Sequence, residues 1–140
     1  MNESNESKFK VKMPKLKKLE YEFNNSYENF DTIKLKVQTE TKILKKINSA
    51  IVSLKLKVFD KNKYELGEVP FYICINMFSE FEWDDSIEEK TVTSLLEGNA
   101  PAVILSYMRP FISSLTTGSG YPPLIVPLLN FKENKVEYIN

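Results

Sequence analysis

Apolar and polar residues alternate along the first half of the sequence. The clearest run places Ile33, Leu35 and Val37 on one parity, with Lys34 and Lys36 between them. A second run has apolar residues at every other position from 50 to 58 and mostly polar residues between them. A period of two is typical of strands that are covered on one face only. The two runs, joined by a turn at residues 45–48, predict an antiparallel hairpin.

Two further stretches predict strands on either side of this hairpin. Residues 9–13 and 19–23 alternate apolar with charged residues around Pro14, which predicts two half-buried strands or one strand interrupted at the proline. Residues 65–83 are instead apolar on both parities. A strand of that kind needs cover on both faces, and in a domain of this size a second copy of the chain supplies it most easily.

The connections are read from turn residues and composition. Residues 24–31 and 60–63 are predicted to be a loop and a turn, and residues 132–140 a short strand or a helical turn. Ser86 and Glu89 have the spacing of a capping box, which predicts a short helix that ends at residues 97–99.

Beyond residue 99 the period changes to three and four. Asn99 is the expected cap of a long helix, Pro101 fits its first turn, and residues 116–120 end it. Pro110 is expected to kink or locally open this helix. The apolar residues on its one broad face are Val103, Ile104, Tyr107, Met108, Phe111, Ile112 and Leu115.

The expected fold is therefore α+β, with a four-stranded antiparallel sheet followed by a short helix and a long helix. Residues 9–140 are expected to form a single domain, and residues 1–8 a disordered N-terminus. After the long helix, residues 121–131 are apolar but rich in proline, so they predict an extended segment that cannot pair as a central strand and must lie on an apolar surface.

Composition excludes several classes of function. Lys plus Arg and Asp plus Glu both number 19, so the net charge of zero gives no general attraction to nucleic acid. The chain has no histidine and one cysteine, Cys74, so we expect no disulfide, no catalytic residues, no metal and no cofactor. The carboxylates of residues 80–89 could act as acid and base or hold a hard cation, but a solvated helix start is the preferred interpretation. No membrane span or secretory signal is seen, so we expect a cytoplasmic protein.

Aromatic and aliphatic side chains are the more promising functional signal. Nine Phe, seven Tyr and one Trp are many for 140 residues. One interpretation places them in the core or in an oligomer interface. The other is a groove between the sheet and the proline-rich segment that binds extended apolar polypeptide. The candidate binding residues are Phe78, Phe81, Trp83, Tyr121, Leu124, Val126 and Leu128.

The helix and the segment after it also carry a recognisable pattern. It consists of Tyr, Arg two residues later, an Ile-Ser-Ser turn, a glycine break, an aromatic residue before Pro, and an Asn-Phe pair. These positions are Tyr107, Arg109, Ile112, Ser113, Ser114, residues 118–120, Tyr121, Pro122, Leu124, Asn130 and Phe131. This stretch resembles the C-terminal half of SecB, the protein-export chaperone family, and the order of strands extends the resemblance over residues 9–131.

The resemblance implies a function and an assembly. SecB-like proteins are cytoplasmic holdases that bind unfolded polypeptides without nucleotide and take part in protein export. They are homotetramers, built as dimers of dimers. By resemblance, four residues of the long helix are assigned partly to the helix-on-helix contact and partly to the core: Tyr107, Met108, Phe111 and Ile112.

The sequence also departs from the family pattern. It ends at Asn140, where the family continues to a tail that contacts the SecA motor, and Pro110 replaces a usual helix former. The sheet face that is acidic for SecA docking in the family is basic here, with Lys34, Lys36, Lys55 and Lys57. Delivery to SecA is therefore not carried over to this chain. A chaperone dedicated to the antitoxin of a toxin–antitoxin system, and an oligomeric interaction module without chaperone activity, stay open as alternatives.

Overall fold

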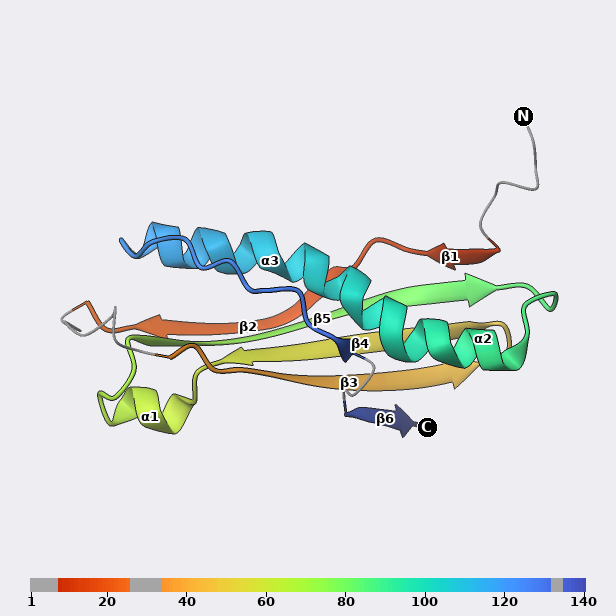
Figure 1. Cartoon of the computed structure of the whole chain (residues 1–140), viewed down its shortest axis with the longest axis horizontal. Helices are drawn as coiled ribbons and strands as arrows, with labels where there is room; N and C mark the ends of the chain where they lie inside the picture. Colours follow the sequence, from red (N-terminus) through yellow and green to blue (C-terminus); the bar gives the residue numbers. More distant parts are fainter. Residues whose placement is uncertain (1–7, 26–33, 132–134) are drawn as a thin grey trace, which may run out of the picture.

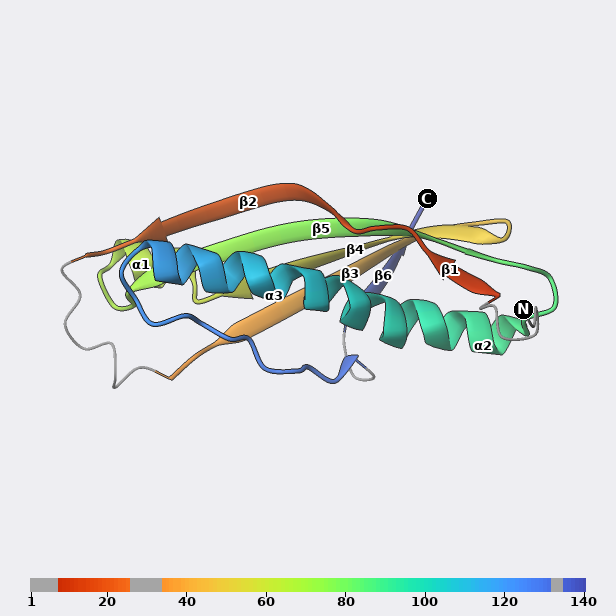
Figure 2. The same cartoon turned by 90° about the horizontal axis from the view of Figure 1, so that it is seen from above.

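One sheet with a long helix across one of its faces makes up most of the molecule (Figure 1; Figure 2). The structure, a computed structural model, describes residues 8–25, 34–131 and 135–140. The strand-then-helix order confirms the predicted α+β class. The expected disorder of the N-terminus and most of the expected loop at 24–31 concern positions outside the described residues.

The sheet contains six strands in the described part of the chain, where four were expected. The first expected strand is divided into β1 and β2, and β6 is added at the other edge. Its order is β1-β5-β4-β3-β6, and β2 pairs with β5 on the same edge as β1. All neighbours are antiparallel except β3 and β6, which are parallel. The strands are β1 (Phe9–Val11), β2 (Lys15–Phe23), β3 (Val37–Lys46), β4 (Ser49–Val58), β5 (Phe71–Trp83) and β6 (Val136–Ile139).

The predicted strands form, but two of them begin later than the alternation suggested. Residues 34–36 and 65–70 lie outside strands, so β3 begins at Val37 and β5 at Phe71. β3 and β4 form the expected hairpin, with Lys46 opposite Ser49 and Asn48 at a φ of 57° in the turn. β1 and β2 run along the same edge of β5 and are separated at Pro14. A proline cannot donate to the ladder, which explains why the strand breaks there. Of the two structures considered for the end of the chain, a strand is the one formed, as β6.

The turn predicted at residues 60–63 is wrong, because these residues begin a short helix, α1 (Lys61–Glu65). Asp60 is its N-cap and its Oδ1 accepts a hydrogen bond of 2.9 Å from the backbone N–H of Asn62. An aspartate before a single helical turn resembles a turn signal in sequence, since the same side-chain bond stabilises both.

The helical region is continuous rather than two helices separated by a cap. It consists of α2 (Glu89–Ser94), a π-helical segment η3 (Leu95–Asn99) and α3 (Ala100–Gly118). Asn99 has helical φ and ψ and makes no side-chain cap, so the predicted cap is wrong. Pro101 lacks a donor and its ring crowds the preceding turn, which favours the wider π-helical geometry there. α3 continues through Pro110, so the proline does not end the helix.

The predicted capping box before α2 is also wrong. The N-cap of α2 is Glu88, which makes no side-chain cap hydrogen bond. The side chain of Ser86 instead bonds Asp84, whose Oδ1 also accepts a 2.8 Å bond from the Ser86 N–H. Asp84 thus forms a local turn of its own, which competes with a helix start at Ser86.

The core lies between the sheet and α3. Its largest fully buried side chains come from alternate positions of β4 and β5 and from the inner face of the helix. They include Leu54, Leu56, Phe71, Ile73, Ile75, Met77, Phe81, Ile104, Leu105 and Met108. No helix in the described ranges is both long enough and apolar enough to cross a membrane.

Candidate functional site

Residues 121–131 form the extended segment that the prolines predicted, and it runs back beside α3 (Figure 2). Several hydrogen bonds hold it. The Leu124 N–H donates to Thr116 Oγ1 at 2.8 Å, Arg109 Nε donates to the Val126 carbonyl at 2.9 Å, and the Tyr121 hydroxyl donates to the Asn24 carbonyl at 2.5 Å. Two side chains of the helix and the Tyr121 hydroxyl therefore attach the segment without strand pairing. Its prolines have no N–H to donate to a strand ladder.

The side chains of this segment divide between core and solvent. Val126 and Phe131 are buried, and Leu124 and Leu129 are half-buried against the core. Ile125 and Leu128 point away from it and are 65% and 82% exposed. The chain therefore uses half of an apolar segment for its own packing and leaves the other half on the surface.

The seven candidate binding residues do not share one surface. Leu128 is exposed, while Tyr121, Leu124 and Phe78 are half-buried. Phe78 lies on the opposite face of the sheet from the segment, because its parity on β5 differs from that of the core residues. The structure therefore places Tyr121, Leu124 and Leu128 together on the segment.

The remaining three candidates are buried in the core of the chain. Phe81 and Val126 are inaccessible, and Trp83 is 8% exposed beneath the ring of Phe9, at 5.9 Å between ring centroids. In this conformation their side chains are not available to a client. Ile125 is a further exposed residue of this surface that was not predicted. Its place between two inward-pointing residues of an extended segment, Leu124 and Val126, is the signal that could have identified it.

The four residues assigned to the helix-on-helix contact and the core differ in burial: two are buried and two are exposed. Met108 and Ile112 are fully buried in the core, whereas Tyr107 and Phe111 are each 42% exposed on the outer side of α3. The two exposed rings are four residues apart and so lie one turn above the other on the helix. Together they present a partly exposed aromatic surface on the outer side of the helix.

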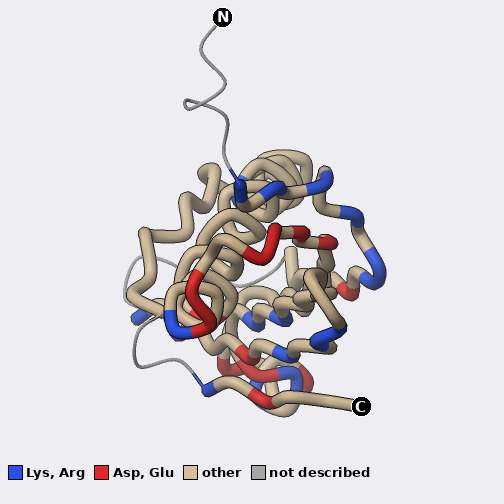
Figure 3. The backbone as a smooth tube through the Cα atoms, turned by 90° about the vertical axis from the view of Figure 1, so that its right-hand side faces the viewer, with Lys and Arg blue, Asp and Glu red and all other residues tan. Residues whose placement is uncertain are grey.

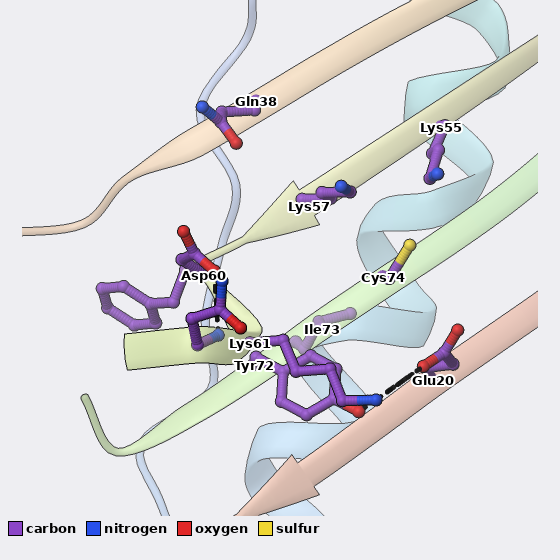
Figure 4. A pocket seen from close by; sticks show the side chains of 11 residues that line it. Glu20, Gln38, Lys55, Lys57, Asp60, Lys61, Tyr72, Ile73 and Cys74 are labelled. Atoms are coloured by element: carbon purple, nitrogen blue, oxygen red, sulfur yellow. Dashed lines mark hydrogen bonds and ion pairs between the residues drawn. The ribbon is translucent and has the colours of Figure 1, made fainter. Parts of the chain in front are cut away.

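The other face of the sheet is open and polar in the described part of the chain. A hollow of about 330 Å³ lies on this face. Figure 4 shows Lys55 and Lys57 on β4 and Glu20 on β2 among the residues that line it. Glu20 is paired with Lys18 at 3.1 Å and Lys61 at 3.9 Å. A hydrogen bond from Lys18, and its charge, lower the pKa of the Glu20 carboxyl below its usual value.

Acidic and basic residues meet at the end of the molecule where β5 leads towards α2 (Figure 3). Lys12 Nζ lies 3.4 Å from Glu80 Oε1 and 3.3 Å from Glu82 Oε1, and Lys45 forms an ion pair with Glu89. The acidic stretch seen in the sequence is thus partly neutralised by Lys12, between β1 and β2, and by Lys45 of β3. Nowhere in the described ranges do three Cys, Asp or Glu side chains gather in a way that could hold a metal ion.

Comparison with known proteins identifies similar sequences. The family model described as Preprotein translocase subunit SecB matches residues 2–134. The protein-export protein SecB of Ehrlichia chaffeensis is 29% identical over 153 residues, covering 89% of this chain and 86% of that protein. The one of Anaplasma phagocytophilum is 26% identical over 141 residues, covering 89% and 88%. An uncharacterized protein of Methanocaldococcus jannaschii is 27% identical over 118 residues, covering 82% and 74%.

Solved structures show the same fold at low identity. A SecB-like chaperone of Mycobacterium tuberculosis, solved in complex with a peptide from an antitoxin, superposes with a TM-score of 0.66 at 12% identity, covering 87% of this chain and 88% of that chain. A protein of unknown function from Streptococcus agalactiae gives a TM-score of 0.52 at 10% identity, covering 85% and 96%.

Proposed function

Since the chain belongs to the SecB family, we propose that it is an ATP-independent holdase that binds non-native polypeptides. The family includes proteins named for protein export, and export is the broader role that membership supports. The finer proposal concerns how this chain binds its clients, and it rests on the surface of residues 121–131 and α3.

One observation carries the proposal. Ile125 and Leu128 are largely exposed on a segment whose neighbouring residues, Leu124 and Val126, are anchored inward. An anchored segment holds its outward apolar side chains in place, so little conformational entropy is lost when a client covers them. An extended apolar polypeptide is the occupant that fits a narrow extended surface of this kind.

A holdase needs no reactive group. A protein that binds the unfolded state of a client lowers the free concentration of that state by mass action, and thus competes with its aggregation. The binding requires exposed apolar area rather than a nucleophile, a base or a cofactor. The peptide held by the similar M. tuberculosis chaperone supports polypeptide as the ligand class for this fold.

We also propose that the chain assembles as a dimer of dimers through the outer side of α3. Tyr107 and Phe111 are the exposed aromatic residues there, and aromatic side chains contribute strongly to interfaces. Their burial against a second copy would leave Ile125 and Leu128 free for a client. Assembly and client binding would then use different apolar residues of the layer formed by α3 and residues 121–131.

The client-binding test uses two substitutions on the exposed side of the segment. In the double variant Ile125→Asp and Leu128→Asp, we expect client affinity to fall about tenfold or more, because covering one aliphatic side chain contributes about 1.5–3 kcal/mol. The measurement is suppression of aggregation of a chemically unfolded client, read by light scattering. Ile47→Asp is the matched control, since Ile47 is 93% exposed in the β3–β4 turn.

Three outcomes separate the alternatives. Loss of capture in the double variant but not in Ile47→Asp supports the holdase and its surface. A wild-type chain that forms its oligomer and suppresses no aggregation would be an interaction module of the same fold. Capture of an antitoxin segment alone, with unfolded proteins of other sequence ignored, would identify a chaperone dedicated to a toxin–antitoxin system.

The assembly test uses the two exposed rings of α3. We expect Tyr107→Asp with Phe111→Asp to lower the solution mass, because two charges would have to be buried against the partner copy. Light scattering coupled to size exclusion measures that mass. An unchanged mass would mean that the copies meet through another surface.

A further inference from the structure

The final strand of the sequence, β6, adds four residues to the outer edge of β3 (Figure 1). It runs parallel to β3, with Val136 opposite Thr41 and Ile139 opposite Leu44. None of its residues is buried: Val136 is half-buried, and Tyr138 and Ile139 are 48% and 39% exposed. Val136 packs against the edge of the core, but because no residue of β6 is buried, its departure would leave no enclosed cavity.

The position that β6 occupies is nevertheless well defined. Thr41 and Ile43 of β3 are fully buried towards the helix layer, and residues opposite them in register share that face. Val136 and Tyr138 therefore point the same way, and the Tyr138 hydroxyl donates to Glu97 Oε2 in η3 at 2.5 Å. The edge of β3 and the π-helical segment together form a slot for an extended chain.

We propose that this slot is a strand-addition site for an extended segment of a client, and that β6 is its exchangeable occupant. The inference rests on the proposed function and adds a place for the client's backbone. Strand addition bonds the main chain of the added segment and takes its specificity from alternate side chains. A site of this kind suits a protein whose clients differ in sequence.

The side chains and direction of β6 indicate which client segments the slot would bind. The preferred segment runs parallel to β3 and carries an aliphatic residue at the place of Val136 and an aromatic residue with a hydroxyl at the place of Tyr138. The residue between them is solvent-facing, as Glu137 is, and is free to vary. An empty edge would expose backbone groups beside the buried Ile43, so exchange of one strand for another is favoured over vacancy.

The test locks β6 onto β3 without removing it. Leu44→Cys and Ile139→Cys are introduced together in a Cys74→Ser background, because these residues are neighbours in register. Adjacent strands lie about 4.8 Å apart, which is within the Cα separation that a disulfide spans. We expect capture of an unfolded client to fall severalfold on oxidation and to return on reduction. The control is Leu44→Cys alone in the same background.

A second measurement needs no client. A fluorescent peptide with the sequence of residues 135–140 is titrated into the reduced and oxidised protein and followed by anisotropy. We expect it to bind the reduced protein only, and the same peptide carrying Val136→Asp and Tyr138→Asp to bind neither. Equal binding to both redox forms would overturn the proposal.

The remaining outcomes are also decisive. If the Cys74→Ser parent captures clients and oxidation of the lock changes nothing, the strand-addition site is wrong and the proposed function stands. If the parent captures nothing, the proposed function fails and the client role of the slot fails with it. If oxidation lowers the mass of the oligomer, β6 exchanges between copies, and a second copy rather than a client is the occupant.

Discussion

The two faces of the sheet are built from the same strands and differ in what lies across them. On the covered face, Ile75 and Met77 of β5 are buried under the layer formed by α3 and residues 121–131. On the open face, the alternate residues Cys74, Asn76 and Phe78 are half-buried. β4 repeats the contrast with buried core residues on one parity and lysines on the other.

The difference shows that a strand with apolar residues at both odd and even positions need not have a buried core on each face of the sheet. Phe78 lies between Lys15 and Ser53 of the neighbouring strands, and Cys74 lies between Glu20 and Lys57. Neighbours in register therefore make the open face a mixed surface. The character of a sheet face depends on several strands together, whereas a sequence pattern describes one strand at a time.

The sharpest test of this contrast uses three consecutive residues of β4. Leu56→Glu should cost more than about 4 kcal/mol in the free energy of unfolding and leave little folded protein, since it buries an unpaired charge. Lys55→Glu and Lys57→Glu, on the open face, should each stay within about 0.5 kcal/mol of the wild type. Urea denaturation measures all three. A large loss in either lysine variant would mean that the open face is covered by a partner.

A second pair compares aromatic residues on the two faces of β5. Phe81→Ala should destabilise the fold by about 3–5 kcal/mol, because Phe81 is fully buried and its removal leaves a cavity. Phe78→Ala should cost only about 1 kcal/mol, because solvent already reaches its ring. Thermal and urea unfolding read both values. Equal losses would contradict the assignment of the two faces.

A third change addresses what attaches residues 121–131 to the covered face. Thr116→Val removes the acceptor of the Leu124 N–H while keeping the shape of the side chain, which should cost about 1–3 kcal/mol. Hydrogen exchange at the Leu124 amide should accelerate as the segment loosens. Thr117→Val is the matched control, since the Thr117 hydroxyl donates to the Ser113 carbonyl in its own helix. Unaltered exchange in Thr116→Val would show that apolar packing alone holds the segment.

The smallest expected effect lies at the edge of the sheet, where Tyr138 of β6 is only partly covered by η3. Partial burial, and then the hydrogen bond to Glu97, raise the pKa of Tyr138 above its usual range. The neutral phenol is thus the form that the fold favours. The contribution of Tyr138 is fully present below the ordinary tyrosine pKa of about 10 and is lost as the pH rises above that value.

Ultraviolet difference titration of the wild type against Tyr138→Phe measures this ionisation. The tyrosine missing from the variant should titrate later than an ordinary phenol, and Glu97→Gln should bring it back towards the usual value. A Tyr138 that titrates near pH 10 in the wild type would show that β6 leaves the edge of β3 readily even without a client.

Much of the fold could be predicted because its signals are local. Alternation along β3 and β4 identified the hairpin, Pro14 identified the break between β1 and β2, and the prolines of residues 121–131 identified an extended segment. The predictions that failed concern the caps at Ser86 and Asn99 and the turn at α1. At each of these positions one polar side chain is compatible with two local structures, and contacts elsewhere select between them.

The candidate site was predicted less completely than the fold. The pattern of the proline-rich segment located a surface that includes Leu128, but composition could not separate exposed Leu128 from buried Val126 two residues earlier. Nor could it separate Tyr107 and Phe111 from Met108 and Ile112 on the same helix. An apolar stripe shows that a face avoids water, while the neighbours determine how much of that face is covered.

The sequence by itself determined the order and type of the main elements and the membership of the SecB family, since both depend on residues a few positions apart. Only the tertiary structure decided which apolar residues remain on the surface, that Thr116 holds Leu124, and that β6 lies parallel to β3. These features join residues distant in the sequence. Their stability comes from desolvation and hydrogen bonding at the contact itself, which no periodicity within one segment records.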